Sequence, residues 1–301
     1  MSTILGGNQY GKAETRVVRV TRDGSTHHIR DLSVSVALSG DLSDVHYSGA
    51  NTNLLPTDTT KNTVFAFAKE HGIESGEQFG IHLARHFVSS QEPIATARIR
   101  IEEYAWERIA APGEADGTGH SFVRRGQETR TTQVSHDGER WEVVSGLKDL
   151  TVLNSTDSEF WGYAKDKYTT LKEAYDRILA TRVSARWRYN WTGDGQAMPD
   201  WDRSYEQART HLLGAFADTY SLSLQQTLYQ MGSRVIENLP EVDEIRFSLP
   251  NSHHFLVDLE PFGLTNDNEV YFAADRPYGL IEGTVLRDGA EARIPVDLTN
   301  L

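Results

Sequence analysis

The sequence predicts an α+β protein in which an antiparallel sheet carries helices on one face. Apolar and polar residues alternate in several long runs, as in half-buried strands, while other runs repeat apolar residues every three or four positions, as in helices. In both halves of the chain, strand-like runs precede and follow the helical ones, which favours this class. The length of 301 residues, at about 150 residues per domain, predicts two domains, which we place at 1–140 and 141–301.

The first half contains clear start and stop signals for helices. Ser75 stands three positions before Gln78, the pattern of a capping box, and Gly72 is a plausible end for the helix before it. The expected elements are, in order, strands around 18–20 and 32–36, helices over 62–71 and after residue 75, and strands over 95–102 and within 122–134.

The second half repeats this order of strands and helices without repeating the amino-acid sequence. Thr170 and Glu173 form a second capping-box pattern, which predicts a short helix that carries Arg177. We expect the strand containing Phe247 to break at Pro250–Asn251. The expected elements are strands over 141–153 and 183–189, a loop at 194–199, helices around 212–216 and 224–235, and a strand over 245–249.

Composition excludes several classes of function. There are 43 acidic against 30 basic residues, a net charge of −13, which argues against binding to nucleic acid or to an anionic membrane surface. No apolar run approaches the roughly 20 residues that span a bilayer. The start of the chain lacks the features of a signal peptide, and the ending Thr299–Leu301 is not a Ser-Lys-Leu peroxisomal address, so a cytoplasmic protein is expected.

The usual cofactor and metal signatures are missing from the sequence. The chain has no cysteine, which removes disulfides, thiolate metal sites and a cysteine nucleophile. His82 and His86 have helical spacing, but Leu83 follows the first histidine where a zinc protease has glutamate. No Gly-rich phosphate loop or dinucleotide fingerprint occurs.

Five clusters of polar and aromatic residues are individually explained by local structure. A lysine beside a glycine turn, as at Lys12, is usually solvated, and Thr57 and Asp58 are typical of a helix entry. His253 shares the parity of an apolar strand face, where a histidine is more often structural than catalytic.

Taken together and in order, the five clusters resemble the urate oxidase (uricase) family over nearly the whole chain. The matching motifs are Tyr10-Gly-Lys12; Thr57-Asp58 with Lys61-Asn-Thr63; Leu150–Leu153 followed by Phe160-Trp-Gly162; Tyr168–Leu171 with Asp176–Leu179; and Leu249-Pro-Asn251 with His253.

The resemblance implies a fold, an assembly and a reaction. The fold is two tandem tunnelling-fold domains, and the assembly is a homotetramer whose sheets close into a barrel. The reaction is the oxidation of urate by molecular oxygen and water to 5-hydroxyisourate and hydrogen peroxide, without metal or organic cofactor.

The resemblance also implies how urate is bound. Arg177 and Gln225 correspond to the residues that grip the pyrimidinedione edge, which suits a planar fork of donors paired with an amide. Phe160 corresponds to the residue that stacks on the purine ring. Asn251 corresponds to the residue that holds oxygen or water above the ring. Further pocket-lining positions are Leu171, Leu224 and Ile281.

Lys12, Thr57 and His253 correspond to the family's proton relay. A lysine acts as a base only when its amine is neutral, and the threonine would pass the proton to the histidine. In the family the threonine motif comes from a neighbouring subunit, so Thr57 and Asp58 are expected to complete another chain's site.

Two other functions remain open at this stage. A tunnelling-fold catalyst that acts on a pterin or a GTP-like purine commonly uses zinc, for which no convincing ligand set is seen. A purine-binding or structural relative without turnover is the alternative from a different class, and the presence of Lys12, Thr57 and His253 speaks against it.

Overall fold

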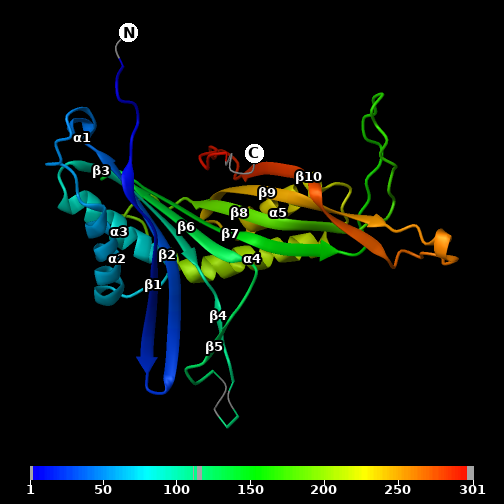
Figure 1. The fold of residues 1–301 in the computed structure, drawn as a ribbon, viewed down its shortest axis with the longest axis horizontal. Helices are drawn as coiled ribbons and strands as arrows, with labels where there is room; N and C mark the ends of the chain where they lie inside the picture. Colours follow the sequence, from blue (N-terminus) through cyan, green and yellow to red (C-terminus); the bar gives the residue numbers. More distant parts are fainter. Residues whose placement is uncertain (1–2, 111, 114–116, 297–301) are drawn as a thin grey trace. The chain divides into compact units, whose positions relative to one another are not determined.

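A computed structural model describes residues 3–110, 112–113 and 117–296 of the chain (Figure 1). The remaining residues, 1–2, 111, 114–116 and 297–301, lie outside the described part, and they include the ending Thr299–Leu301. The elements are, in order, β1 (Tyr10–Asp23), β2 (Thr26–Gly40), α1 (Ser43–Tyr47), α2 (Thr57–Glu70), α3 (Gly76–Ser90), β3 (Ile94–Glu103), β4 (Trp106–Arg108), β5 (Phe122–Arg124), β6 (Thr129–His136), β7 (Trp141–Asn154), β8 (Leu179–Tyr189), α4 (Trp201–Asp218), α5 (Leu224–Asn238), β9 (Val242–Leu256), a 3-10 turn (Glu260–Phe262) and β10 (Tyr271–Leu286).

The chain divides into two compact units that exchange segments. The first comprises 1–146 and 188–203, and the second comprises 147–187 and 204–301. Both β7 and β8 continue across this division. Compactness and internal repetition are different criteria, so the predicted tandem boundary at residue 140 stays a prediction.

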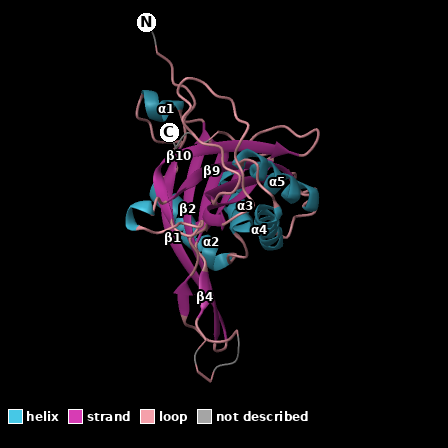
Figure 2. Ribbon diagram, turned by 90° about the vertical axis from the view of Figure 1, so that its right-hand side faces the viewer, coloured by secondary structure: helices cyan, strands magenta, loops and turns pink. Residues whose placement is uncertain are grey.

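In the first unit, helices α2 and α3 cover one face of a sheet with strand order β1-β2-β3-β6-β7 (Figures 1 and 2). The pairs from β1 to β6 are antiparallel, and Ile99 lies between Val36 and Val134 in the register. Helix α3 approaches this sheet closely at Gly80, where an added Cβ would lie 2.8 Å from Cγ2 of Val134. A glycine is therefore needed at this helix–sheet contact.

In the second unit, the strand order is β7-β8-β9-β10, and α5 packs against β9 and β10. The alternation predicted for β8 buries Ala185 and Trp187, while Phe247 and Leu249 of β9 are also buried. The fold is thus α+β with an antiparallel sheet, as predicted. Within the described residues, no helix is both long enough and apolar enough to cross a bilayer.

The predicted helix signals near Ser75 and Gly72 are confirmed. The Ser75 hydroxyl accepts a hydrogen bond from the Gln78 backbone N–H at 3.0 Å, and Gly72 takes the left-handed conformation with φ of +78°. Helix α2 begins at Thr57, five residues before the predicted start at Asn62, because Pro56 occupies the N-cap position with a φ of −55°.

Two predictions for the second half are wrong. No helix begins at Thr170, because Ala174 pairs with Phe160 as an extended bridge. The Glu173 carboxylate bonds Lys165 and Tyr175, each at 3.0 Å, and so makes no capping box. Strand β9 also continues through Pro250–Asn251 without a break, since the Pro250 carbonyl accepts a bond from the buried Thr181 hydroxyl at 2.9 Å.

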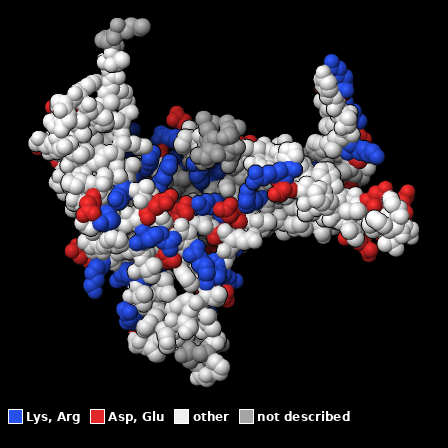
Figure 3. Space-filling model, viewed as in Figure 1, with Lys and Arg blue, Asp and Glu red and all other residues white. Residues whose placement is uncertain are grey.

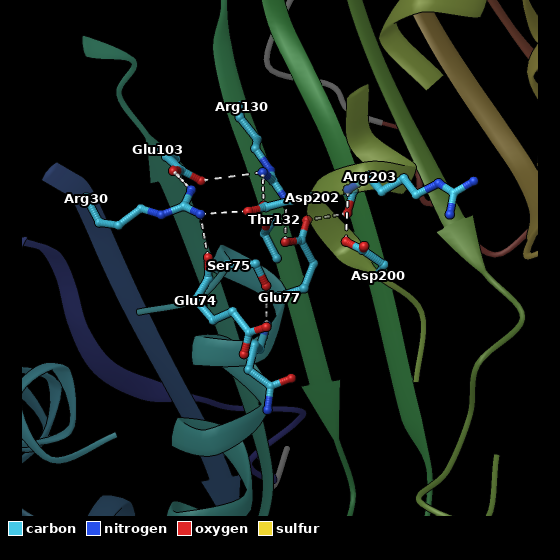
Figure 4. A network of polar contacts seen from close by, with 12 residues as sticks. Arg30, Glu74, Ser75, Glu77, Glu103, Arg130, Thr132, Asp200, Asp202 and Arg203 are labelled. Carbon is cyan, nitrogen blue, oxygen red and sulfur yellow. Dashed lines mark hydrogen bonds and ion pairs between the residues drawn. The ribbon is translucent and has the colours of Figure 1, made fainter. Parts of the chain in front are cut away.

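A buried carboxylate, Glu77, joins α3 to the sheet of the first unit (Figure 4). It is 0% exposed and accepts bonds from Arg130 at 2.7 Å, from Thr132 at 3.0 Å and from Ser145. Burial by itself would lower the pKa of Arg130, but Glu77 and the further carboxylates Glu103 and Asp202 raise it overall. The cation is thus held charged inside the unit. On the face shown in Figure 3, other basic and acidic side chains are interspersed.

Removing the Glu77 carboxylate is expected to destabilise the protein strongly. Glu77→Ala leaves the Arg130 guanidinium buried beside fewer carboxylates, and we expect the free energy of unfolding to fall by about 3–5 kcal/mol. The measurement is urea denaturation followed by circular dichroism. Glu70→Ala, at an exposed position on α2, is the control and is expected to change stability by less than about 0.5 kcal/mol. Equal effects of the two variants would contradict the role given to Glu77.

Candidate active site

Phe160 and Arg177 are brought together by a short antiparallel pairing in the second unit. Phe160 and Ala174 exchange two backbone hydrogen bonds, of 2.7 and 2.9 Å. The guanidinium carbon of Arg177 lies 5.2 Å from the centre of the Phe160 ring, and the Tyr163 ring stacks on Phe160 with centroids 5.0 Å apart. A planar ligand that stacks on Phe160 therefore lies within reach of a cation.

Arg177 carries a positive charge that the described part of the chain does not neutralise. The side chain is half-buried, burial lowers its pKa, and no described carboxylate forms an ion pair with it. Its Nε donates to the Ser158 hydroxyl at 3.1 Å. A desolvated cation without a carboxylate partner is costly unless a ligand supplies the negative charge, which marks this position as an anion site.

A second pairing connects this segment to the start of α5. Ser158 and Ser221 form a parallel bridge, in which the Glu159 N–H donates to the Ser221 carbonyl at 2.7 Å and the Ser221 N–H donates to the Asp157 carbonyl at 2.8 Å. Ser223 follows as the N-cap of α5. The helix start that carries Leu224 and Gln225 is therefore held beside the segment that carries Phe160 and Arg177.

The two glutamines at the start of α5 have different roles. The Gln226 side chain accepts a bond from the Leu222 N–H at 2.8 Å, and the Gln226 N–H donates to the Ser223 hydroxyl at 3.1 Å. Gln225 is exposed, and its side-chain amide has no hydrogen-bond partner within the described residues. Gln226 is thus part of the helix cap, whereas Gln225 is available to a ligand.

The start of α5 lies at the level of Ile281 and Leu249. In α5, Gly232 lies against Val285 of β10, and Leu228, four residues earlier, lies against Gly283 of β10. One turn of the helix therefore runs alongside two residues of the strand. If the same step continues for one more turn, Leu224 is expected at the level of Ile281, which pairs with Leu249. The 2% exposure of Leu224 agrees with this position.

Asn251 and His253 lie two and four residues beyond Leu249, on the same face of β9. Asn251 pairs with Gly279, and His253 pairs with Ala274. Between these two pairs β10 has an irregularity, so residues 275–278 leave the regular register. Asn251 therefore lies just beyond the first turn of α5, where Gln225 is exposed.

Lys12 lies in the first unit, at the end of a regular stretch of β1. It pairs with Val36 and is followed by an irregularity at residues 13 and 14, where Glu14 has a φ of +57°. An added Cβ at Gly11 would lie 1.9 Å from the Val36 carbonyl oxygen, so a glycine is required before Lys12. The Tyr10 hydroxyl accepts a bond from the Leu55 N–H at 3.0 Å, which ties this strand to the segment entering α2.

Thr57 and Asp58 form the first turn of α2 in the same unit. The Thr57 carbonyl accepts a bond from the Thr60 hydroxyl at 2.7 Å, while the Thr57 hydroxyl has no partner within the described residues. Hydrogen bonds and charge from Lys61, a hydrogen bond from Asn62 and the charge of Lys12 lower the pKa of Asp58. The charge of Lys12 makes the smallest of these contributions.

The predicted site residues thus fall into two groups, one in each unit. Lys12, Thr57 and Asp58 form the first group. The second group comprises Phe160, Arg177, Leu224, Gln225, Asn251 and His253. Leu171 is 58% exposed, and its carbonyl accepts a bond from Tyr163.

Sequence analysis missed Ser158 and the stacking of Tyr163 on Phe160. Both belong to the motif around Phe160, but neither has a sequence signal that separates it from its neighbours. The roles of Ser158 and Tyr163 depend on the backbone bridges to residues 221 and 174, which no local sequence pattern specifies.

The histidines of the helical face are engaged with one another and with aromatic rings. His82 lies with its ring 5.0 Å from that of His71 and bonds Gln78 at 2.8 Å, and burial lowers the pKa of both His82 and His86. Among residues 3–110, 112–113 and 117–296, no three or more His, Asp or Glu side chains are arranged to hold a metal ion.

Comparisons with known proteins agree on one family. The family model described as Uricase matches residues 8–135 and 143–282. The chain is 50% identical to the uricase of Arthrobacter globiformis over 293 residues, 97% of this chain and 93% of that protein, and 36% identical to the uricase of Danio rerio over 92% and 93%.

Solved structures show the same fold. The crystal structure of uricase from Arthrobacter globiformis superposes with a TM-score of 0.92 at 49% identity, covering 98% of this chain and 99% of that one. A uricase from Bacillus fastidious has a TM-score of 0.78 at 23% identity and covers 93% and 94%. The chain belongs to the uricase family.

The different roles of the two glutamines predict different effects on stability. Gln226→Ala removes the acceptor for the Leu222 N–H and is expected to cost about 1 kcal/mol, as the loss of a helix cap does. Gln225→Ala is expected to leave the thermal unfolding midpoint within about a degree of wild type, since it removes no contact of the folded chain. A matching loss of stability in both variants, measured by differential scanning fluorimetry, would show that Gln225 is also structural.

Proposed function

We propose that this chain oxidises urate with molecular oxygen and water to 5-hydroxyisourate and hydrogen peroxide, using no metal or organic cofactor, as a step of purine degradation. Family membership supports this assignment. The observation that carries it is the position of half-buried Arg177 over the Phe160 ring, with no carboxylate partner among the described residues. Urate is planar and anionic, so it matches both a stacking surface and a guanidinium.

In this proposal the second unit binds the substrate. Phe160 stacks on the purine, while Arg177 and Gln225 bind the pyrimidinedione edge through two guanidinium donors and one amide. Asn251 holds oxygen or water above the ring. Leu171, Leu224 and Ile281 line the pocket. The exposed, unbonded amide of Gln225 and the position of Asn251 beyond the first turn of α5 support these roles.

The chemistry transfers two electrons from urate to oxygen. Triplet oxygen cannot add to singlet urate in one concerted step, so a deprotonated, electron-rich urate first reduces oxygen by one electron. The resulting radical pair combines to a peroxide at C5; the bond between C5 and the peroxide oxygen then breaks as hydrogen peroxide leaves, and water adds at C5 in its place. One urate, one oxygen and one water give one 5-hydroxyisourate and one hydrogen peroxide.

The protein supplies orientation, proton removal and exclusion of bulk water. We assign the proton relay to Lys12, Thr57 and His253. The unbonded Thr57 hydroxyl and the electrostatic influence of Lys12 on α2 support a shared role for the two residues of the first unit.

We further propose that the working enzyme is a homotetramer of chains with two tandem tunnelling-fold domains, 1–140 and 141–301. The sheets of the four chains would close into a barrel. Thr57 and Asp58 would then complete the site of a neighbouring chain, as the family pattern implies. Cytoplasmic location is part of the same proposal.

The direct test follows urate absorbance in the near ultraviolet together with oxygen uptake, with and without a chelator. We expect urate, oxygen and peroxide to change in a 1:1:1 ratio, with no effect of the chelator. Inactivity of the purified protein in aerated urate would refute the assignment. Stoichiometric zinc, with activity that the chelator abolishes, would instead support a zinc-dependent tunnelling-fold enzyme.

Two substitutions separate the proton relay from substrate binding. Lys12→Met is expected to reduce kcat by about 10²–10⁴-fold, as loss of a general base does, with little change in urate affinity. Arg177→Ala is expected to weaken urate binding by about 10- to 100-fold, because a charge-assisted contact is lost. Steady-state kinetics and equilibrium binding without oxygen provide the measurements.

Lys69→Met, at an exposed position on α2, is the matched control for Lys12→Met and should behave as wild type. If Lys12→Met lost affinity and turnover in equal measure, Lys12 would hold substrate rather than move a proton.

A further inference from the structure

Ser158 contacts Arg177 through both its backbone and its side chain. The Arg177 N–H donates to the Ser158 carbonyl at 2.9 Å, and the Arg177 Nε donates to the Ser158 hydroxyl at 3.1 Å. These two bonds fix Arg177 at its backbone and at the Nε of its side chain. The terminal guanidinium nitrogens have no hydrogen-bond partner within the described residues.

Ser158 is itself held rigidly. It is 1% exposed, and its backbone pairs with Ser221 through the flanking bonds of Glu159 and Asp157. These flanking bonds join backbone atoms and do not involve the Ser221 hydroxyl, and Ser221 lies two residues before Ser223, the N-cap of α5. The acceptor for Arg177 is therefore anchored to the first turn of α5.

A fixed Nε determines the plane of the whole guanidinium group, because the group is rigid and flat. With Nε bonded to Ser158, the two terminal nitrogens are left for one ligand. A long arginine side chain without such a bond has many rotamers, and ordering it on binding weakens the affinity.

We propose that Ser158 is a positioning residue for the substrate: its hydroxyl fixes the Arg177 guanidinium so that both terminal nitrogens face the pyrimidinedione edge of urate. This inference rests on the proposed function and deepens it. Ser158 touches no reacting atom, so it affects binding and leaves the chemical step unchanged.

Ser158→Ala is expected to raise KM for urate by roughly five- to tenfold, the loss that removal of one typical hydrogen bond brings. The change in kcat is expected to stay below about twofold, since the relay residues are intact. The dissociation constant of xanthine, which shares the pyrimidinedione ring of urate, should rise by the same factor as KM when measured by calorimetry. Ser158→Thr keeps the hydroxyl and should restore most of the affinity.

Ser221→Ala is the matched control. Ser221 is also a buried serine of the same bridge, but its hydroxyl bonds Thr227 and Ser223 and does not reach Arg177. It should therefore change the melting temperature without changing KM. An equal rise of KM in both serine variants would overturn the proposal. If Ser158→Ala does not fold, Ser158→Cys, which keeps the size but accepts hydrogen bonds weakly, takes its place.

A double-mutant cycle tests whether Ser158 acts through Nε. Lysine has no counterpart of the arginine Nε–H, so in an Arg177→Lys background Ser158→Ala should change KM and xanthine affinity by less than about 1.5-fold. The full five- to tenfold effect in that background would overturn the proposal.

These outcomes differ from those that test the function itself. A wild-type protein that does not oxidise urate refutes the proposed function. An active wild-type protein whose Ser158→Ala variant binds urate and xanthine normally refutes only the role of Ser158.

Discussion

The backbone pairing of Ser158 with Ser221 is the interaction on which the substrate-binding part of the molecule depends. It brings the segment that carries Phe160 and Arg177 against Ser221, two residues before the N-cap of α5. Two stretches more than 60 residues apart are thereby fixed by backbone bonds of 2.7 and 2.8 Å. Side chains that bind a flat anion need fixed relative positions, and backbone pairing supplies them at a lower entropic cost than long side chains can.

The second constraint is electrostatic. The chain has a net charge of −13, which repels an anion at long range, yet Arg177 remains half-buried without a carboxylate partner among the described residues. Arg130, by contrast, lies beside three carboxylates, those of Glu77, Glu103 and Asp202. The contrast between Arg130 and Arg177 separates a structural arginine from one that is left available to a ligand.

The sequence predicts those elements of the structure whose signals, such as helix caps and apolar periodicity, involve residues close together in the chain. The capping-box pattern at Ser75 and the apolar periodicity over 224–235 predicted α3 and α5, because the groups that satisfy these patterns lie within one or two helical turns. The pattern at Thr170 resembled a cap equally well but was overridden by pairing with Phe160. Local propensity is weak compared with a tertiary backbone pairing, so this helix does not form.

The sequence by itself determined the α+β class, most strands, the start of α5 and, through ordered motifs, membership of the uricase family. Only the tertiary structure decided which glutamine caps a helix and which is free, and that Ser158 holds Arg177. The physical reason is that hydrophobic periodicity and helix capping depend on residues that are close to one another in the sequence. The hydrogen-bond partner of a side chain depends instead on which distant strand or bridge the fold places beside it.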